Sequence, residues 1–339
     1  MSKKKLLIGA TIVFLLILVL LAVLVVVKLR DRKTKTPAAE SLSTILVNVR
    51  AGQHTLALNQ NGKVRSYIVY IPNLYSKNQK YPLVFSLHGG GSNAKEQMNL
   101  NDLNQVADEN NFIVVYPNAV GSNWNDGRAH TTEKSNNADD VGFIKLIIEK
   151  LSQWVSIDSQ KIYATGISNG GMMSLRLACD ASETFAAAAP VASSMPEELK
   201  ANCAPTKAIS VLEIQGTADP LVPYLGGGIK GLAGRDTAGR GVLLSATESA
   251  KFWWDFDKCA HLDKVTPLAD TDPNDGTTSS QSLHETCENS TQVGLITVTG
   301  GGHTWPGGKQ YLGERLVGKV SKDFSASQII WDFFKTKTR

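Results

Sequence analysis

The sequence is poor in cysteine and in net charge. Four cysteines in 339 residues are too few for a small scaffold built around disulfides. Lysine and arginine (35) barely outnumber aspartate and glutamate (31), and 42% of the residues are hydrophobic, so the composition is not that of a disordered protein. Glycine and aromatic contents are ordinary, which excludes collagen-like and low-complexity chains. The length allows one large α/β domain or two smaller domains with a substantial core.

The small positive excess, +4, is confined to the amino-terminal end. Residues 1–36 hold eight basic side chains and one acidic side chain, which gives +7. The remainder holds 27 basic and 30 acidic side chains, which gives −3. Because solvated basic residues beside an apolar run can serve as a membrane flank, nothing in this balance calls for a nucleic-acid partner.

The longest apolar run, residues 6–27, contains 22 residues without a charge. As a helix it would extend about 33 Å, enough to cross a hydrocarbon core of roughly 30 Å. A cleaved signal peptide is the alternative, but its apolar region is usually about 7–15 residues and ends at small residues, whereas residues 24–28 offer no Ala-x-Ala site. We therefore predict a basic flank at 1–5, an uncleaved transmembrane anchor at 6–27, a polar tether at 28–42 and a folded domain at 43–339.

The folded domain alternates predicted strands and helices. Two β-rich runs, 44–58 and 63–71, are joined by a turn at 59–62 and predict a hairpin. Apolar strands are then expected at 81–87, 112–116, 161–165, 185–191, 208–215 and 293–299, and helices at 96–110, 139–154, 170–178, 243–257 and 325–335. Strands that are apolar throughout indicate a mostly parallel sheet covered by helices on both faces, with an active site at the carboxyl ends of its strands.

A Gly-x-Ser-x-Gly pentapeptide at 166–170 follows one of these strands and opens a helix. The glycines permit a sharp turn that exposes the hydroxyl of Ser168 at the sheet edge. At the helix amino terminus the dipole favours developing negative charge. An ordinary glycine-rich turn is the alternative, but the strand–turn–helix context predicts that Ser168 is a nucleophile.

His88 and three glycines directly follow the strand predicted at 81–87. Consecutive glycines let backbone N–H groups approach a ligand, so we predict an oxyanion hole formed by the N–H groups of Gly90, Gly91 and Asn169. A phosphate-binding loop is the alternative, but no Gly-x4-Gly-Lys-Ser/Thr pattern follows. We interpret His88 as a residue that shapes this loop rather than as a base.

Asp219 and His303 each come shortly after a predicted strand. His303 could take the proton of Ser168, and Asp219 could orient and stabilise that histidine. Glu213, within a strand, and Asp236, in a glycine-rich loop, are less well placed for the acidic role. The chain order of serine, aspartate and histidine is that of α/β-hydrolases.

The other histidines give no metal signal. His54 lies in the predicted hairpin, and His130, His261 and His284 lie in polar stretches, where we expect surface side chains. No close spacing of His, Cys and carboxylate residues is of the zinc type, so we expect neither a metal nor another cofactor.

Residues 62–334 resemble the polyhydroxybutyrate depolymerase/feruloyl esterase family of α/β-hydrolases. The blocks that carry the resemblance are LHGGGSN (87–93), YPN (116–118), ADDVGFI (138–144), TGISNGGMM (165–173), QGTADPLVPY (215–224), GGHTWPG (301–307) and SASQIIWDFF (325–334). The resemblance implies a triad of Ser168, Asp219 and His303, and an exported, disulfide-tolerant enzyme that acts on carboxylic esters.

Aromatic side chains near these motifs are candidates for substrate contact. Trp124, with Asn125 and Asp126, and Trp305 could line the cleft, because aromatic faces suit phenolic or polymeric substrates. Packing of loop residues is the alternative for both tryptophans.

The four cysteines allow three pairings. We favour Cys179–Cys203, which would link the helix after Ser168 to the entry of the next strand, and Cys259–Cys287, which would close the polar loop 263–283. Four reduced thiols are the alternative. Two disulfides require an oxidising compartment, so we expect the folded domain outside the cytoplasm, periplasmic or extracellular, although basic residues at both ends of the apolar run leave its orientation open.

The sequence thus predicts a membrane-anchored serine esterase. Its expected substrates are hydroxyalkanoate esters of the polyhydroxybutyrate type, or feruloyl and acetyl esters of polysaccharides. A serine peptidase on the same fold is one alternative. A non-catalytic surface protein that binds polysaccharide or lipid in the cleft is another.

Overall fold

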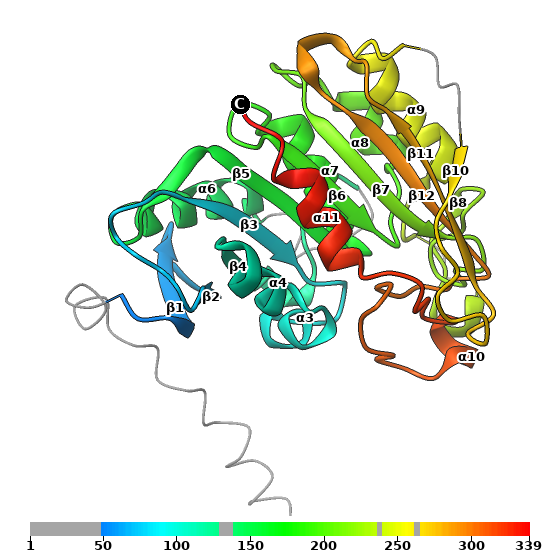
Figure 1. Cartoon of the computed structure of the whole chain (residues 1–339), viewed down its shortest axis with the longest axis horizontal. Helices are drawn as coiled ribbons and strands as arrows, with labels where there is room; N and C mark the ends of the chain where they lie inside the picture. Colours follow the sequence, from blue (N-terminus) through cyan, green and yellow to red (C-terminus); the bar gives the residue numbers. More distant parts are fainter. Residues whose placement is uncertain (1–48, 129–137, 236–238, 261–264) are drawn as a thin grey trace, which may run out of the picture. The chain divides into compact units, whose positions relative to one another are not determined.

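The described residues form a ten-stranded mixed sheet in the computed structural model (Figure 1). The structure describes residues 49–128, 138–235, 239–260 and 265–339, all within the unit Ser41–Arg339. The predicted anchor, its flanks, His130, Asp236 and His261 lie outside the described residues. No helix in the described ranges is both long enough and apolar enough to cross a membrane.

Parallel strands form the centre of the sheet, and antiparallel strands extend both edges. The strand order is β1-β2-β4-β3-β5-β6-β7-β12-β11-β10. The edge hairpin is β1 (Gly52–Gln60) and β2 (Lys63–Ile71); the parallel strands are β3 (Tyr81–Leu87), β4 (Ile113–Pro117), β5 (Ile157–Ile167), β6 (Ala187–Val191), β7 (Ser210–Gly216) and β12 (Val293–Thr299). The predicted parallel sheet and its preceding hairpin are therefore confirmed.

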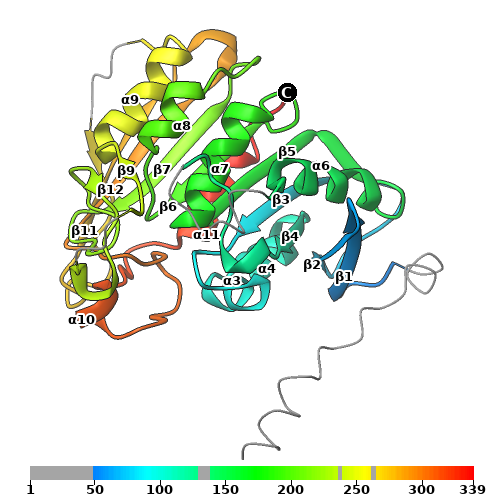
Figure 2. The same cartoon turned by 180° about the vertical axis from the view of Figure 1, so that it is seen from behind.

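Helices cover both faces of this sheet. Alternate strand residues point to opposite faces, as Phe85 and Val84 do by packing into different core clusters. One face carries α3 (Ala94–Leu100), α4 (Leu103–Asn110) and α11 (Ala326–Phe334); the other carries α6 (Asp140–Leu151), α7 (Asn169–Asp180), α8 (Glu197–Asn202) and α9 (Ala246–Phe256), which Figure 2 shows in front. This double covering explains why the central strands are apolar throughout.

Two expected elements differ from the structure. The single helix predicted at 96–110 is interrupted at Asn101, whose backbone is extended and whose buried amide donates to Ser86 Oγ at 3.1 Å. The loop predicted at 263–283 instead contains β10 (Val265–Pro267) and β11 (Thr278–His284), which pair antiparallel beyond β12. The serine- and threonine-rich sequence of β11 concealed this strand, because it lacks a regular apolar alternation.

His284 is not a surface group. Its side chain is buried, stacks on Trp254 with ring centroids 4.6 Å apart, and Nδ1 lies 2.9 Å from the carbonyl oxygen of Ala260. The neighbouring Cys259–Cys287 disulfide holds this end of β11 against the segment after α9. The expectation of an exposed His284 was therefore wrong, because the polar stretch around it is anchored by a disulfide.

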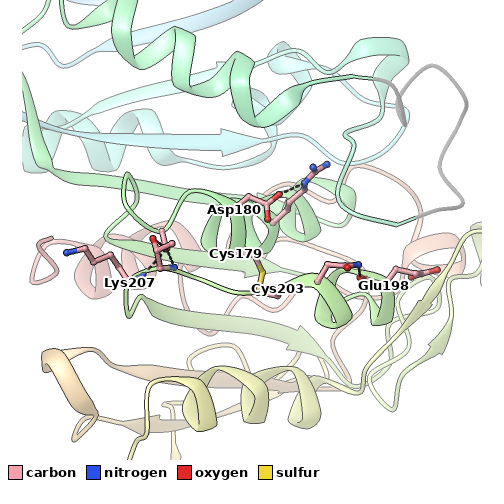
Figure 3. The surroundings of a disulfide bond; sticks show 9 residues. Cys179, Asp180, Glu198, Cys203 and Lys207 are labelled. Atoms are coloured by element: carbon pink, nitrogen blue, oxygen red, sulfur yellow. Dashed lines mark hydrogen bonds and ion pairs between the residues drawn. A yellow bond between two sulfur atoms is a disulfide. The ribbon is translucent and has the colours of Figure 1, made fainter.

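The Cys179–Cys203 disulfide joins the last turn of α7 to the residue that ends α8 (Figure 3). Both pairings favoured from the sequence are thus present.

Because Cys179 and Cys203 are 24 residues apart, the double variant Cys179→Ala/Cys203→Ala is expected to lose about 3 kcal/mol of unfolding free energy. Urea unfolding measures this loss. The single variant Cys203→Ala should lose a similar amount, and a loss below about 1 kcal/mol in both would contradict the prediction.

Glu213 is a fully buried carboxyl in the centre of β7. Its Oε1 accepts a hydrogen bond from Ser249 Oγ at 2.6 Å, and burial raises its pKa to about 8 from an ordinary value of 4.5. The folded state therefore keeps this proton up to about pH 8, whereas the unfolded state releases it near pH 4.5. It follows that the free energy of unfolding falls as the pH rises between these two values.

The variant Glu213→Gln removes this titration. Its stability relative to the parent is expected to increase between pH 5 and pH 8, by on the order of 3 kcal/mol. Urea unfolding at both pH values measures the change, and Glu149→Gln, an exposed position on α6, is the matched control. Parallel stability curves for Glu213→Gln and the parent would show that Glu213 does not titrate in this way.

Candidate active site

Ser168 occupies the turn between β5 and α7. Its backbone has φ 57° and ψ −124°, a conformation that is strained for a residue with a side chain. The adjacent glycines are sterically required, because a Cβ on Gly170 would lie 2.2 Å from the carbonyl oxygen of Leu87 and one on Gly166 would lie 2.6 Å from the same atom. The turn predicted from the pentapeptide is therefore present and presses against the end of β3.

Ser168 and His303 line one cavity of about 1020 Å³ beside the carboxyl ends of β3 and β5. Among the described residues, much of its wall comes from 89–92 after β3, from 221, 229, 230, 232 and 240 after β7, and from 309–312 after His303. The apolar part of the lining consists of Leu100, Ile167, Met172, Leu221, Ile229, Leu232 and Leu312. The cavity is large enough for a substrate of drug size or more.

Asp219 and His303 form a buried pair. His303 Nδ1 lies 2.8 Å from Asp219 Oδ2, and both side chains are almost fully shielded from solvent. The other carboxylate oxygen of Asp219 accepts the N–H groups of Leu221 and Val222, each at 2.8 Å. These bonds fix the carboxylate, which in turn orients the imidazole.

Tyr311 supports His303 from the cavity side. Its hydroxyl donates to the carbonyl oxygen of His303 at 3.0 Å, and its side chain lines the cavity. Among the described residues, no hydrogen bond joins Ser168 Oγ to His303. Such bonds are often long before substrate binds and shorten in the substrate complex.

The oxyanion-hole prediction is corrected at Gly91. Its N–H donates to the carbonyl oxygen of Ser122 at 2.8 Å, so it does not point at a substrate. In the described part of the chain, the N–H groups of Gly90 and Asn169 have no such acceptor, and the Asn169 N–H opens helix α7. A Cβ built on Gly90 would lie 3.7 Å from the Cβ of Asn169. The two residues that carry these N–H groups therefore lie side by side in space, although they are far apart in sequence.

The side chain of Asn169 is clamped by the loop before α6. Its Oδ1 accepts the N–H of Trp124 at 2.7 Å, and its Nδ2 donates to Asp126 Oδ2 at 2.5 Å. Asp126 is held by Arg128, whose Nε lies 2.9 Å from Oδ2 and whose Nη1 donates to the carbonyl oxygen of Arg240 at 2.7 Å. These bonds fix the first turn of α7 and therefore the direction of its N–H groups.

This clamp was not predicted, because only the backbone of Asn169 was given a role from its position after Ser168. Asp126 was expected to line the cleft, whereas it is fully buried. The sequence feature that could have indicated the clamp is Asp-Gly-Arg at 126–128. A turn at the glycine brings the carboxylate and the guanidinium close enough to bond.

Neither tryptophan reaches the cavity, which corrects the predicted substrate contacts. Trp124 is 0% exposed and donates its indole N–H to the carbonyl oxygen of His88 at 2.9 Å. Trp305 is 1% exposed and donates to Ser327 Oγ at 3.1 Å. Because both indole N–H groups bond within the protein, these side chains pack the loops, as the alternative interpretation held.

His88 shapes the loop after β3, as interpreted from the sequence. Its Nε2 accepts the N–H of Ala119 at 3.1 Å, and its Nδ1 donates to the carbonyl oxygen of Gly89 at 2.8 Å. Burial lowers the pKa of His88 to about 4, so the ring is neutral near pH 7. Both ring nitrogens are occupied, which leaves none for proton transfer to a substrate.

Within the described ranges, no group of three or more His, Cys, Asp or Glu side chains is arranged so that it could hold a metal ion. The chemical groups that the structure brings to the cavity are the serine hydroxyl, the histidine–aspartate pair and the backbone N–H donors.

The known proteins that this chain resembles in sequence include several esterases. The chain is 32% identical over 281 residues to "Putative esterase NocK" of Nocardia uniformis subsp. tsuyamanensis, covering 80% of this chain and 79% of that protein. It is 29% identical over 251 residues to "Feruloyl esterase B" of Piromyces equi, covering 72% of this chain but 44% of that protein. It is 31% identical over 179 residues to "Feruloyl esterase C" of Emericella nidulans, covering 51% of this chain and 61% of that protein.

A family model and a solved structure add to these relatives. Residues 99–201 match the model described as "Prolyl oligopeptidase family", a segment that includes Ser168 but neither Asp219 nor His303. The acetyl xylan esterase from Aspergillus awamori superposes with a TM-score of 0.51 and 18% identity, covering 74% of this chain and 94% of that one. At this identity the superposition shows a shared fold.

Proposed function

Because this chain belongs to the polyhydroxybutyrate depolymerase/feruloyl esterase family of α/β-hydrolases and is a serine esterase, we propose that Ser168, His303 and Asp219 are its catalytic triad. We propose as its substrates feruloyl or acetyl esters of polysaccharides, with hydroxyalkanoate esters as the other candidates. The observation that carries the proposal is the His303–Asp219 pair, bonded at 2.8 Å, on the same cavity as the strained Ser168 turn.

Each residue has a defined role in the reaction, and His303 acts first as a base and then as an acid. Ser168 Oγ attacks the ester carbonyl carbon while His303 Nε2 takes its proton, and Asp219 stabilises the imidazolium that results. The N–H groups of Gly90 and Asn169 stabilise the oxyanion. His303 then protonates the leaving alcohol, and water activated by the same ring hydrolyses the acyl-enzyme at Ser168.

Covalent labelling tests the nucleophile directly. A fluorophosphonate probe is expected to modify Ser168, as located by mass spectrometry of the labelled peptide. The labelled protein should no longer hydrolyse 4-nitrophenyl acetate. Binding of a polysaccharide without labelling and without ester turnover would instead favour the non-catalytic alternative.

A panel of esters tests the substrate. Methyl ferulate, an acetylated xylan oligosaccharide and the methyl ester of a hydroxybutyrate dimer, none of which carries a carboxylate, are compared by kcat/KM under one condition. We expect the feruloyl or acetyl ester to give the highest value, because the relatives named above include feruloyl esterases. A hydroxybutyrate dimer that exceeded both would assign the enzyme to hydroxyalkanoate esters.

A serine peptidase is the second candidate, because residues 99–201 match the prolyl oligopeptidase family. The test compares the 4-nitrophenyl ester and the 4-nitroanilide of the same acyl group. Faster turnover of the ester supports the esterase, and preferential turnover of the anilide would support the peptidase.

We also propose that residues 6–27 anchor the enzyme and that the folded domain lies outside the cytoplasm. Support comes from the two disulfides, which form in oxidising compartments. Protease added to intact cells should degrade the folded domain if this topology holds. If the domain is protected in intact cells, protease is added to spheroplasts, whose periplasm is open; protection there until the cytoplasmic membrane is lysed would place the domain in the cytoplasm.

A further inference from the structure

We propose that the substrate carries a negative charge on one side of the ester, a specificity that rests on the esterase function proposed above. Of the residues that the structure describes, the cavity lining includes one carboxylate, Glu96, and four cationic side chains: Arg128, Lys230, Arg240 and Lys309. This sign contrasts with residues 37–339 as a whole, which carry a net charge of −3. The cavity therefore concentrates positive charge in a weakly acidic domain.

The cations differ in how far they are already neutralised. Arg128 is bound by Asp126, so it contributes little to the field in the cavity. Arg240 and Lys309 are exposed, and among the described residues no carboxylate oxygen lies within 4.0 Å of their cationic nitrogens. Glu96 accepts a hydrogen bond from Ser92 Oγ at 2.7 Å. Arg240 and Lys309 are thus the residues through which an anionic substrate would be recognised.

Arg240 and Lys309 belong to separate walls. The carbonyl oxygen of Arg240 is held by Arg128, and the next carbonyl oxygen, of Gly241, accepts the N–H of Ile229 at 3.3 Å. The N–H of Lys309 donates to the carbonyl oxygen of Leu100 at 3.0 Å, at the end of α3. Each wall therefore has a fixed backbone that places one cationic residue in the lining of the cavity that contains Ser168.

An ester has two parts, the acyl group and the alcohol, and either can carry the charge. A carboxylate on the acyl group would make the substrate a half-ester of a dicarboxylic acid. A carboxylate on the alcohol would make it an ester of an acidic sugar or another acidic hydroxyl compound. In both cases the attraction is electrostatic, so it acts on kcat/KM and weakens with salt.

Two pairs of matched esters test the proposal. The acyl pair is mono-4-nitrophenyl adipate and 4-nitrophenyl hexanoate. The alcohol pair is the butyrate ester of 4-hydroxybenzoate and that of its methyl ester. For each pair, the ratio of kcat/KM for the anionic ester to that for the neutral ester is measured at about 20 mM and about 500 mM NaCl.

We expect this ratio to exceed about ten in one pair at low salt and to fall severalfold at high salt. Arg240→Gln or Lys309→Gln should lower that ratio about fivefold, because each substitution removes one positive charge from the cavity lining. Arg315→Gln, an exposed cation outside the lining, should leave the ratio unchanged. The pair that responds identifies whether the charge lies on the acyl group or on the alcohol.

Ratios at or below one in both pairs, or ratios unaffected by salt and by both cavity variants, would overturn the proposal. Neutral-ester hydrolysis keeps this outcome separate from failure of the esterase assignment. If the parent hydrolyses the neutral esters and Ser168→Ala does not, the esterase function stands and only the charge preference is lost.

Discussion

Replacement of Ser168 by alanine is expected to lower kcat for a short 4-nitrophenyl ester by about a million-fold. The change removes the attacking oxygen but leaves the N–H groups of Gly90 and Asn169, so a residual rate above that of water should remain. KM is expected to change little, because the hydroxyl contributes mainly to the covalent step. Initial rates and fluorophosphonate labelling measure the loss.

Stability should be unaffected by this substitution. Alanine, like serine, carries a Cβ, so the strain at φ 57° is the same in both proteins. The matched control is Ser193→Ala, a buried serine outside the cavity lining whose hydroxyl has no hydrogen-bond partner in the structure. If Ser168→Ala kept activity within tenfold of the parent, Ser168 would not be the nucleophile.

Replacement of Asp219 by asparagine is expected to lower kcat by about 10,000-fold. The N–H groups of Leu221 and Val222 donate to Oδ1, so the asparagine must place its oxygen there. Its NH2 group then faces His303 Nδ1 and donates to it. The imidazole proton is thereby forced onto Nε2, which leaves no basic nitrogen facing Ser168.

The rival carboxyl, Glu213, supplies the control for this prediction. It contacts Ser249 Oγ rather than His303, so Glu213→Gln should keep kcat close to that of the parent. The melting temperature of Asp219→Asn should also stay close, because both bonds to Oδ1 persist. A loss smaller than tenfold in Asp219→Asn, or a loss of similar size in Glu213→Gln, would reassign the acid.

The sequence predicted those parts of the site in which a position in a local motif requires one particular type of residue. The glycines around Ser168 could be recognised because a Cβ there would strike the carbonyl oxygen of Leu87. Asp219 and His303 could be recognised because each lies close behind an apolar strand. In both cases the local pattern alone sets where the side chain must be.

The errors concern directions in space that no local pattern encodes. Gly91 is a glycine in the loop expected to form the oxyanion hole, and its φ is +78°. Its N–H, however, donates to the carbonyl oxygen of Ser122 and not toward a substrate. Trp124 is an aromatic residue of the kind that often lines a cleft, but its indole N–H donates to the carbonyl oxygen of His88, 36 residues away in sequence. Both outcomes depend on tertiary contacts between loops, which composition and periodicity do not contain.

The bonds that hold the proposed triad also reach the walls of the cavity. Leu221 lines the cavity and fixes the carboxylate of Asp219 through its backbone N–H. Tyr311 also lines the cavity, and its side-chain hydroxyl donates to the carbonyl oxygen of His303. Evolution of new substrate ranges is therefore constrained at Tyr311, whose side chain makes its bond, whereas at Leu221 any residue except proline would keep the bond to Asp219. Wall residues such as Ile229, Leu232 and Leu312 are freer to diverge, and a mutant library restricted to them would vary the substrate while sparing the proton-transfer geometry.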